Sequence, residues 1–149
     1  MTTSEAVLIS AHLVATATMV GLIWFVQVVH YPLFASVGTD SFARYEVRHQ
    51  RLTSFVVGPF MAVEGGTAIW LAIASPPDVS RMWPLVGLGL LGVVHASTVL
   101  MQVPLHASLI HGFDSQKVSR LVQTNWIRTV GWSIRGAIAS LIVVQALIA

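Results

Sequence analysis

Two of the six histidines in this 149-residue chain stand at the ends of long apolar runs. His30 follows Gln27 by three residues near the end of the first run, and His106 follows Gln102 by four near the end of the third. Residues three or four apart share a helix face, so each histidine should lie beside its glutamine. Imidazole nitrogens bind transition metals and exchange protons near neutral pH. The two positions therefore predict a metal site or an acid–base centre.

A third histidine, His49, lies in the polar segment after the first run, one turn beyond Tyr45. If the first and third runs cross a membrane in the same direction, His30 and His106 end at a similar depth, close to His49. We expect these three histidines to hold a transition metal (Fe, Cu or Zn) whose ligands are oriented by further partners. A haem held by His30 and His106 is one alternative, and metal-free interfacial histidines are another.

Four further polar residues interrupt apolar sequence. Glu64 and Arg135 fall well inside their runs, where an unpaired charge is costly, so we expect a buried ion pair between two helices. The pair would either fix how the helices pack or make Glu64 a proton carrier or metal ligand. Asn125 and Arg128 open the last run, and as hydrogen-bond donors they would suit an oxygen anion, an enolate or a quinone carbonyl.

The composition requires lipid around the helices that carry these residues. Hydrophobic residues make up 55% of the chain and charged residues only 9%, against about 25% in soluble domains. A helix needs roughly 20 apolar residues to cross a bilayer. We therefore predict one integral membrane domain over residues 1–149, an all-α bundle of four transmembrane helices. The predicted spans are about 6–34, 54–74, 82–110 and 127–149, with short amphipathic helices after the first and third.

Basic residues predict the orientation of the bundle. Arg44, Arg48 and Arg51 follow the first span and Lys117 and Arg120 follow the third, whereas the loop after the second span has only Arg81. By the positive-inside rule both termini lie outside the cytoplasm, and we expect a bacterial inner membrane. The basic residues form no cluster that would indicate nucleic acid. The absence of cysteine excludes thiolate metal sites and disulfides.

A weak internal repeat relates the two halves. Residues 38–41 (Gly-Thr-Asp-Ser) recur as residues 112–115 (Gly-Phe-Asp-Ser), and Gln27 with Pro32 recurs as Gln102 with Pro104. The repeat predicts two related helical hairpins, with spans one and three at corresponding depths.

Three of these features together resemble a known family. The His30-Tyr31-Pro32 end of span one, Pro104 in span three and the run from residue 125 to 135 resemble the small four-helix membrane proteins often described as anthrone oxygenase-like. The resemblance covers essentially the whole chain in length and architecture. It implies oxidation of a polycyclic phenolic carbonyl compound at the membrane.

Two readings of function follow. In the first, the chain is a membrane oxidoreductase or oxygenase that acts on a lipophilic small molecule near the cytoplasmic face. Its metal ligands are His30, His49 and His106, and its catalytic residues are His30, His49, Glu64, Asn125, Arg128 and Arg135. In the second, it is a non-enzymatic assembly factor, small transporter or complex subunit, with Glu64–Arg135 as a packing device. The expected partners are membrane lipid and a lipophilic molecule but no nucleic acid, and self-association into a homo-oligomer is left open.

Overall fold

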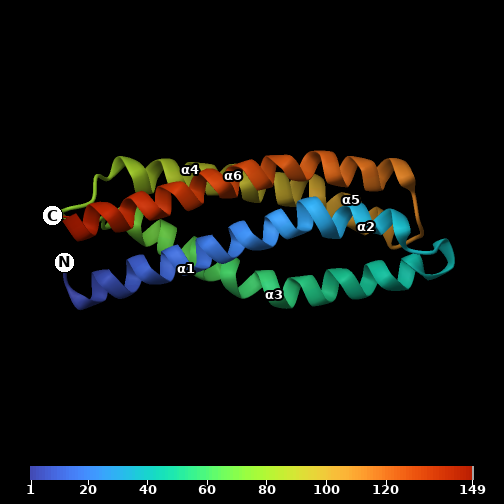
Figure 1. Cartoon of the computed structure of the whole chain (residues 1–149), viewed down its shortest axis with the longest axis horizontal. Coiled ribbons are helices and arrows are strands. Elements are labelled where there is room, and N and C mark those ends of the chain that lie inside the picture. The colour runs from blue at the N-terminus through green and yellow to red at the C-terminus, as the bar shows by residue number, and fades with distance from the viewer. Residues whose placement is uncertain (149) are drawn as a thin grey trace.

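Apolar sequence organises the chain into four helical rods. The structure is a computed structural model that describes residues 1–148, and within them it contains helices and no strands (Figure 1). Ala149, the last residue of the predicted fourth span, lies outside the described residues. In chain order the elements are α1 (Thr3–Phe25), the π-helix η1 (Val26–His30), α2 (Tyr31–Leu33), the 3-10 helix η2 (Phe34–Ser36), α3 (Thr39–Ile73), α4 (Met82–Ser97), the π-helix η3 (Thr98–Gln102), α5 (Val103–Leu109) and α6 (Ser115–Ile148).

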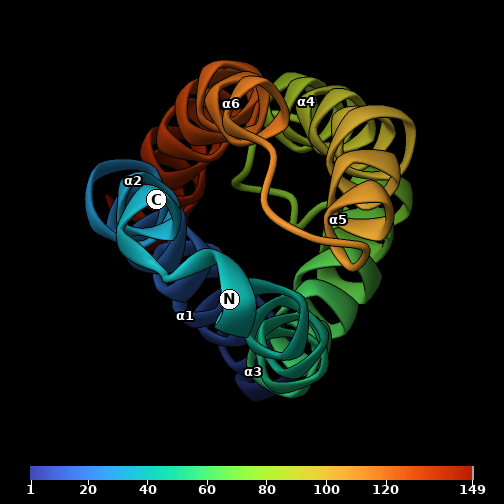
Figure 2. The same ribbon diagram turned by 90° about the vertical axis from the view of Figure 1, so that its right-hand side faces the viewer.

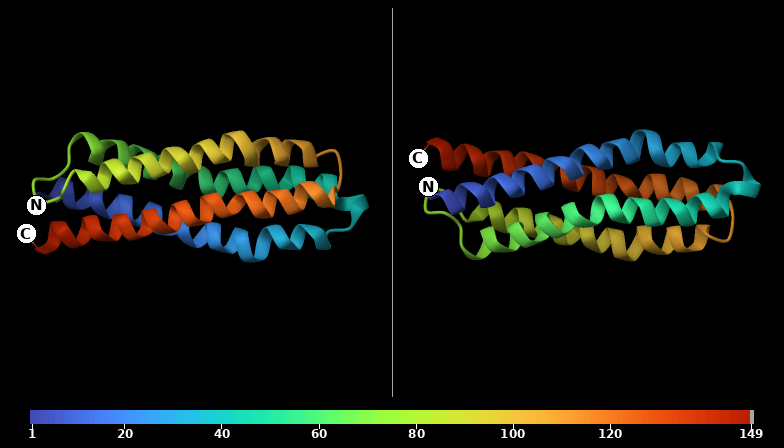
Figure 3. Two further views of the ribbon diagram at one scale, coloured as in Figure 1. Left: turned by 90° about the horizontal axis from the view of Figure 1, so that it is seen from above. Right: turned by 90° about the horizontal axis from the view of Figure 1, so that it is seen from below.

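The rods run antiparallel in a closed ring. Rod α1–η2 packs between α3 and α6, and rod α4–α5 packs between the same two helices on the opposite side (Figure 2). The N-terminus and the loop at residues 74–81 lie at one end of the bundle, called here the terminal end (Figures 1 and 3). The loops at residues 37–38 and 110–114 lie at the other end, called the basic end because the exposed Arg44, Arg48 and Arg51 stand there. The predicted four-span bundle is confirmed.

The rods are longer than a membrane is thick. They contain 34, 35, 28 and 34 residues, so the longest measure about 50 Å against roughly 30 Å of hydrocarbon. The segments predicted as separate amphipathic helices are the first turns of α3 and α6, which begin at Thr39 and Ser115 rather than near 54 and 127. Their polar first turns therefore extend the bundle into the headgroup region at the basic end.

The π-helix η1 changes which residues of the first rod face the core. In α1 the buried residues advance in steps of three and four, a spacing that would continue at residues 26, 30 and 33. A π-helix accommodates one extra residue in a turn. The buried positions are accordingly shifted by one, to Gln27, Tyr31 and Phe34. His30 is consequently only half-buried.

The third rod repeats this change. Its buried residues Pro84, Gly87, Leu91 and Val94 predict 101, 105 and 108 as later core positions, but after η3 the core side bears Gln102, His106 and Leu109. The repeat predicted from Gln27 and Gln102 thus coincides with a pair of π-helices at corresponding places. Each one directs a glutamine, and one turn later a ring that can form hydrogen bonds, into the bundle.

The core changes character along the bundle. Aliphatic residues of α1, α3 and α6 pack at the terminal end, and Met19, Val94 and Trp132 pack in the middle. The basic end combines aliphatic residues with several aromatic rings, among them Tyr31 and Phe34. The polar cluster described next lies against these aromatic rings.

Candidate functional site

Three metal-ligating side chains converge inside the basic end. Glu46 and His49 are three residues apart on α3 and therefore share the face that α3 turns to the core. His106 reaches them from α5. One ligand atom of each residue lies within 4.8 Å of the other two. Two histidines and one carboxylate are a ligand set typical of non-haem iron(II) sites.

His106 is held between two partners. Its Nδ1 lies 2.6 Å from Oε1 of Glu46, and its Nε2 lies 2.9 Å from the Tyr31 hydroxyl. When Glu46 is ionised, Nδ1–H donates to the carboxylate and Nε2 accepts from Tyr31. Gln50 supports this arrangement by donating to Glu46 Oε1 and to the His106 carbonyl, both at 3.0 Å. The chain Tyr31–His106–Glu46 is thus a continuous path for a proton.

His49 is oriented from the other side. Its Nδ1 lies 2.9 Å from Nε2 of His30 and 3.1 Å from Oγ1 of Thr53, which leaves its Nε2 available to a ligand. His30 was expected to be a metal ligand, but Glu46 takes that position in the cluster. His30 instead lies behind His49 as its hydrogen-bond partner, because η1 turns Tyr31 rather than His30 into the core.

Glu46 has one carboxylate oxygen without a partner in the described part of the chain. Its side chain is 0% exposed, and Oε2 has no hydrogen-bond partner among the described residues. A buried carboxylate oxygen without a partner is destabilising unless a cation compensates it. The Glu46 carboxylate therefore has the strongest requirement for a positive ligand in the cluster.

A cavity adjoins His49 and His106. Its volume is about 170 Å³, and it is open on one side. Arg128, one of the predicted donors, lines it, with its guanidinium 5.5 Å from the ring centre of Trp132. Among residues 1–148, Arg128 forms no salt bridge and its Nε has no hydrogen-bond partner, while its guanidinium lies close to the Tyr31 hydroxyl.

Asn125 does not share this cavity. It is 0% exposed, and its Nδ2 donates to Oε1 of Gln27 at 2.9 Å. Gln27 in turn donates to the carbonyl of Val122 at 3.1 Å, which ties the first rod to α6. The two residues predicted to bind one oxygen together are therefore separated: Arg128 faces the cavity and Asn125 joins two helices.

The predicted ion pair is present but lies elsewhere. Arg135 Nε and Nη2 each lie 2.9 Å from Oε1 of Glu64, and Trp132 donates to the other carboxylate oxygen at 2.9 Å. Arg135 Nη1 also donates to the Gly87 carbonyl, so the pair joins α3, α4 and α6. Glu64 is fifteen residues beyond His49 on α3, about 22 Å toward the terminal end. The pair is therefore separate from the histidine cluster.

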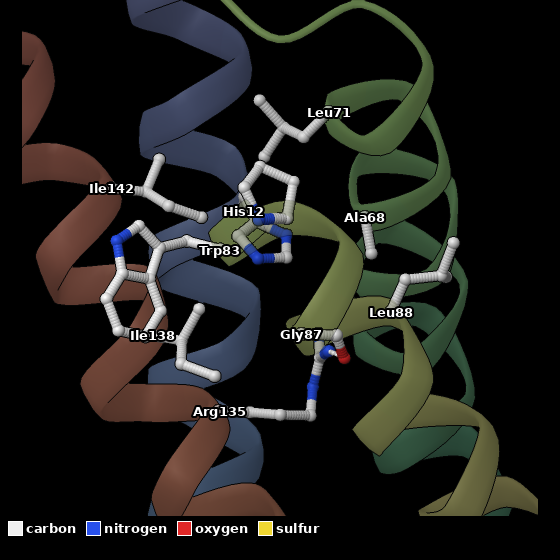
Figure 4. A pocket seen from close by; sticks show the side chains of 10 residues that line it. His12, Ala68, Leu71, Trp83, Gly87, Leu88, Arg135, Ile138 and Ile142 are labelled. Atoms are coloured by element: carbon white, nitrogen blue, oxygen red, sulfur yellow. Dashed lines mark hydrogen bonds between the residues drawn. The ribbon is translucent and has the colours of Figure 1, made fainter. Parts of the chain in front are cut away.

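A second, very small cavity lies beside this pair. Figure 4 shows His12, Arg135 and Gly87 around it, and its volume of about 10 Å³ holds roughly one water molecule. His12 is buried, and its Nδ1 lies 2.9 Å from the Thr67 hydroxyl. His95 bonds the carbonyl of Leu91 one turn before it.

Two central residues were not predicted from the sequence. Glu46 was detectable, because Glu46-Val47-Arg48-His49 has the Glu-x-x-His spacing that supplies metal ligands in other helix bundles. Tyr31 was not, because ordinary helical spacing points to His30 as the inward residue.

Comparison with known proteins adds no relative to this description. No known protein family matches the sequence, and neither a characterised protein nor a solved structure matches it.

Proposed function

We propose that the chain is a membrane oxidoreductase whose centre is a single transition-metal ion bound by Glu46, His49 and His106. Iron(II) is the ion that we propose in the first place. The observation that carries this proposal is that one ligand atom of each residue lies within 4.8 Å of the other two, beside an open cavity, while Oε2 of Glu46 has no partner within residues 1–148. Copper and zinc accept the same nitrogen and oxygen ligands and are the alternatives.

The surroundings of the two histidines support metal ligation. In metal sites, the ring nitrogen that does not bind the ion is usually held by a second partner. Here His30 and Thr53 hold Nδ1 of His49, and Tyr31 holds Nε2 of His106. A metal ion would replace the proton between His106 and Glu46. A bare ion suits this spacing better than a haem, because the rings of His49 and His106 have centres only 5.2 Å apart.

The cavity supplies the rest of the proposed reaction site. A lipophilic substrate would enter it with an oxygen atom against Arg128 and exchange its proton with the Tyr31 hydroxyl, which is held by Nε2 of His106. Bound iron would supply the redox step, with dioxygen as oxidant. Asn125, Glu64 and Arg135 position helices in this proposal and do not touch the substrate.

Metal analysis tests the proposal directly. We expect purified protein reconstituted with iron(II) to retain roughly one ion per chain after desalting, and Glu46→Gln, His49→Ala and His106→Ala to lose it. His95→Ala is the matched control, since His95 bonds only its own helix. Parent protein that retains none of iron, copper or zinc, or ligand variants that retain as much as the control, would refute the metal centre.

One observation supports the alternative, a non-enzymatic membrane protein. Glu64 and Arg135 join three helices and are 0% and 2% exposed, which favours a packing role for this pair. If the metal centre fails, a non-enzymatic membrane protein of this architecture is the remaining proposal.

We also propose that the basic end faces the cytoplasm of a bacterial inner membrane, with both termini outside. The chain has no cysteine, so introduced thiols are unambiguous labels. In intact cells, an impermeant maleimide should label Ser4→Cys and spare Ser115→Cys. The reverse pattern would invert the proposed orientation.

A further inference from the structure

Arg128 is a cation without a counter-charge at the wall of a cavity. It is half-buried and packs over Trp132, which limits where its guanidinium can point. The nearby carboxylate of Glu46 bonds His106 and Gln50 instead. An intramembrane arginine that has no salt bridge and lines a cavity indicates a ligand with an acceptor oxygen.

The cavity opens toward lipid. Two of its lining residues, Ser54 on α3 and Val103 on α5, are exposed, so the mouth lies between these two helices. The α3 portion of the lining runs from His49 to Met61. The stretch from Thr53 to Met61 lies about 18–30 Å from the end of α3 at the terminal end of the bundle. The mouth therefore stands at the edge of the hydrocarbon layer, where a membrane-dissolved molecule can enter sideways.

The size of the cavity limits the ligand. An apolar cavity of about 150 Å³ takes up one benzene molecule, so the 170 Å³ here holds one substituted six-membered ring. The lining is mixed, with Tyr31, Gln102 and Arg128 among its polar members and Val57 and Met61 among its apolar ones. An oxygen-substituted six-membered ring fits a lining of this mixed polarity.

We propose that the cavity binds the head of a lipid-soluble benzoquinone or its quinol, with a ring oxygen on Arg128 and a hydrocarbon tail leaving between α3 and α5. The tail has to leave, because the ring fills the available volume. This inference takes from the proposed function only that the cavity is the substrate site, and it does not require a bound metal.

Binding is measured on metal-free protein so that the two proposals can fail separately. Parent protein and Glu46→Gln, both treated with chelator in phosphatidylcholine nanodiscs, are titrated with a benzoquinone that carries a ten-carbon tail. Binding is followed by quenching of tryptophan fluorescence and confirmed by calorimetry. We expect saturable binding at about one molecule per chain in both proteins.

Two variants test the geometry. Arg128→Gln removes a charged hydrogen bond and should weaken binding about ten- to a hundredfold. Val57→Trp fills the apolar side of the cavity and should abolish binding without changing a charge. Arg120→Gln is the control for loss of an arginine from the same helix, because Arg120 lines a different hollow. Thermal unfolding of each variant shows that it is folded.

Several results would overturn the inference. One is non-saturable quenching that is equal in the parent, Arg128→Gln and Val57→Trp, because it would mean that the quinone only partitions into the lipid. Another is tighter binding of a three-ring ketone than of the single-ring quinone, because it would show that the cavity is not matched to a single ring. Loss of metal binding in Glu46→Gln with quinone binding intact supports both proposals, whereas quinone binding to a parent that never holds metal supports this one alone.

Discussion

Replacing Glu64 by glutamine keeps the size of the side chain and removes its charge. The guanidinium of Arg135, 2% exposed, then has no counter-charge within the membrane. Two unit charges about 4 Å apart attract by about 4 kcal/mol at an effective dielectric constant of about 20, and breaking a buried pair costs about 3–5 kcal/mol. We therefore expect Glu64→Gln to lower the free energy of unfolding by about 3–4 kcal/mol.

The double variant separates the charge interaction from packing. Arg135→Met alone leaves the Glu64 carboxylate with only the indole N–H of Trp132 as a donor, and it should be similarly destabilising. In Glu64→Gln/Arg135→Met no charge remains, and the glutamine can still accept from Trp132. The double variant should therefore be more stable than the sum of the single changes predicts, by at least about 2 kcal/mol.

Reversible unfolding by SDS in mixed micelles, followed by tryptophan fluorescence, measures these differences. Glu5→Gln is the matched control, because Glu5 is partly exposed in the first turn of α1 and bonds only the N-cap there. A Glu64→Gln variant within about 0.5 kcal/mol of the parent would refute a stabilising pair. Strict additivity in the double variant would refute the charge interaction as its cause.

Three further predictions use the same unfolding assay. Gly131→Ala should lower the free energy of unfolding by about 1–3 kcal/mol, because the added Cβ would stand 2.6 Å from a valine methyl of α4. Gly21→Ala should raise it by up to about 1 kcal/mol, because a Cβ there has nothing within 4 Å. Equal effects of the two changes would contradict this packing. Gln27→Leu leaves a buried amide donor of α6 unpaired and should cost about 1–3 kcal/mol, and a neutral result would mean that the hydrogen bond is dispensable. The backbone N–H of Lys117, with that of the preceding residue, lowers the pKa of Asp114, so this carboxylate stabilises the start of α6 above about pH 4 and the contribution is lost as pH falls through the lowered pKa. Asp114→Asn should flatten that pH dependence, and an unchanged profile would exclude Asp114 as its source.

The fold was predictable because lipid simplifies the sequence pattern. Long apolar runs have few alternatives to membrane-spanning helices, and the cost of isolated charges in lipid predicts the pairing of Glu64 with Arg135. The residues at which α3 and α6 begin were harder to predict from the sequence. Their first turns are polar because they extend beyond the hydrocarbon, and a polar helical segment next to an apolar one looks the same in sequence whether or not a break separates them.

The site was only partly predictable. His49 and His106 were expected to approach each other and do so, and the spacing of Glu46 from His49 is visible in the sequence. The exchange of His30 for Tyr31 depends on the backbone of η1, which does not follow from hydrophobic spacing. The separation of Asn125 from Arg128 depends on the acceptor Gln27, which is 98 positions away from Asn125 in the chain and is brought near only by packing.

The two π-helices have a consequence for how such a bundle changes over time. Loss of one residue from 26–30 and one from 98–102 would restore regular α-helices and shorten each rod by only about 1.5 Å. It would also turn Tyr31 and His106 by about 100° about their rod axes, away from each other and from Glu46. A bundle that merely spans the membrane and one that encloses a polar centre thus differ by two single-codon insertions. Insertion and deletion, rather than substitution, is the short route by which this architecture gains or loses its site.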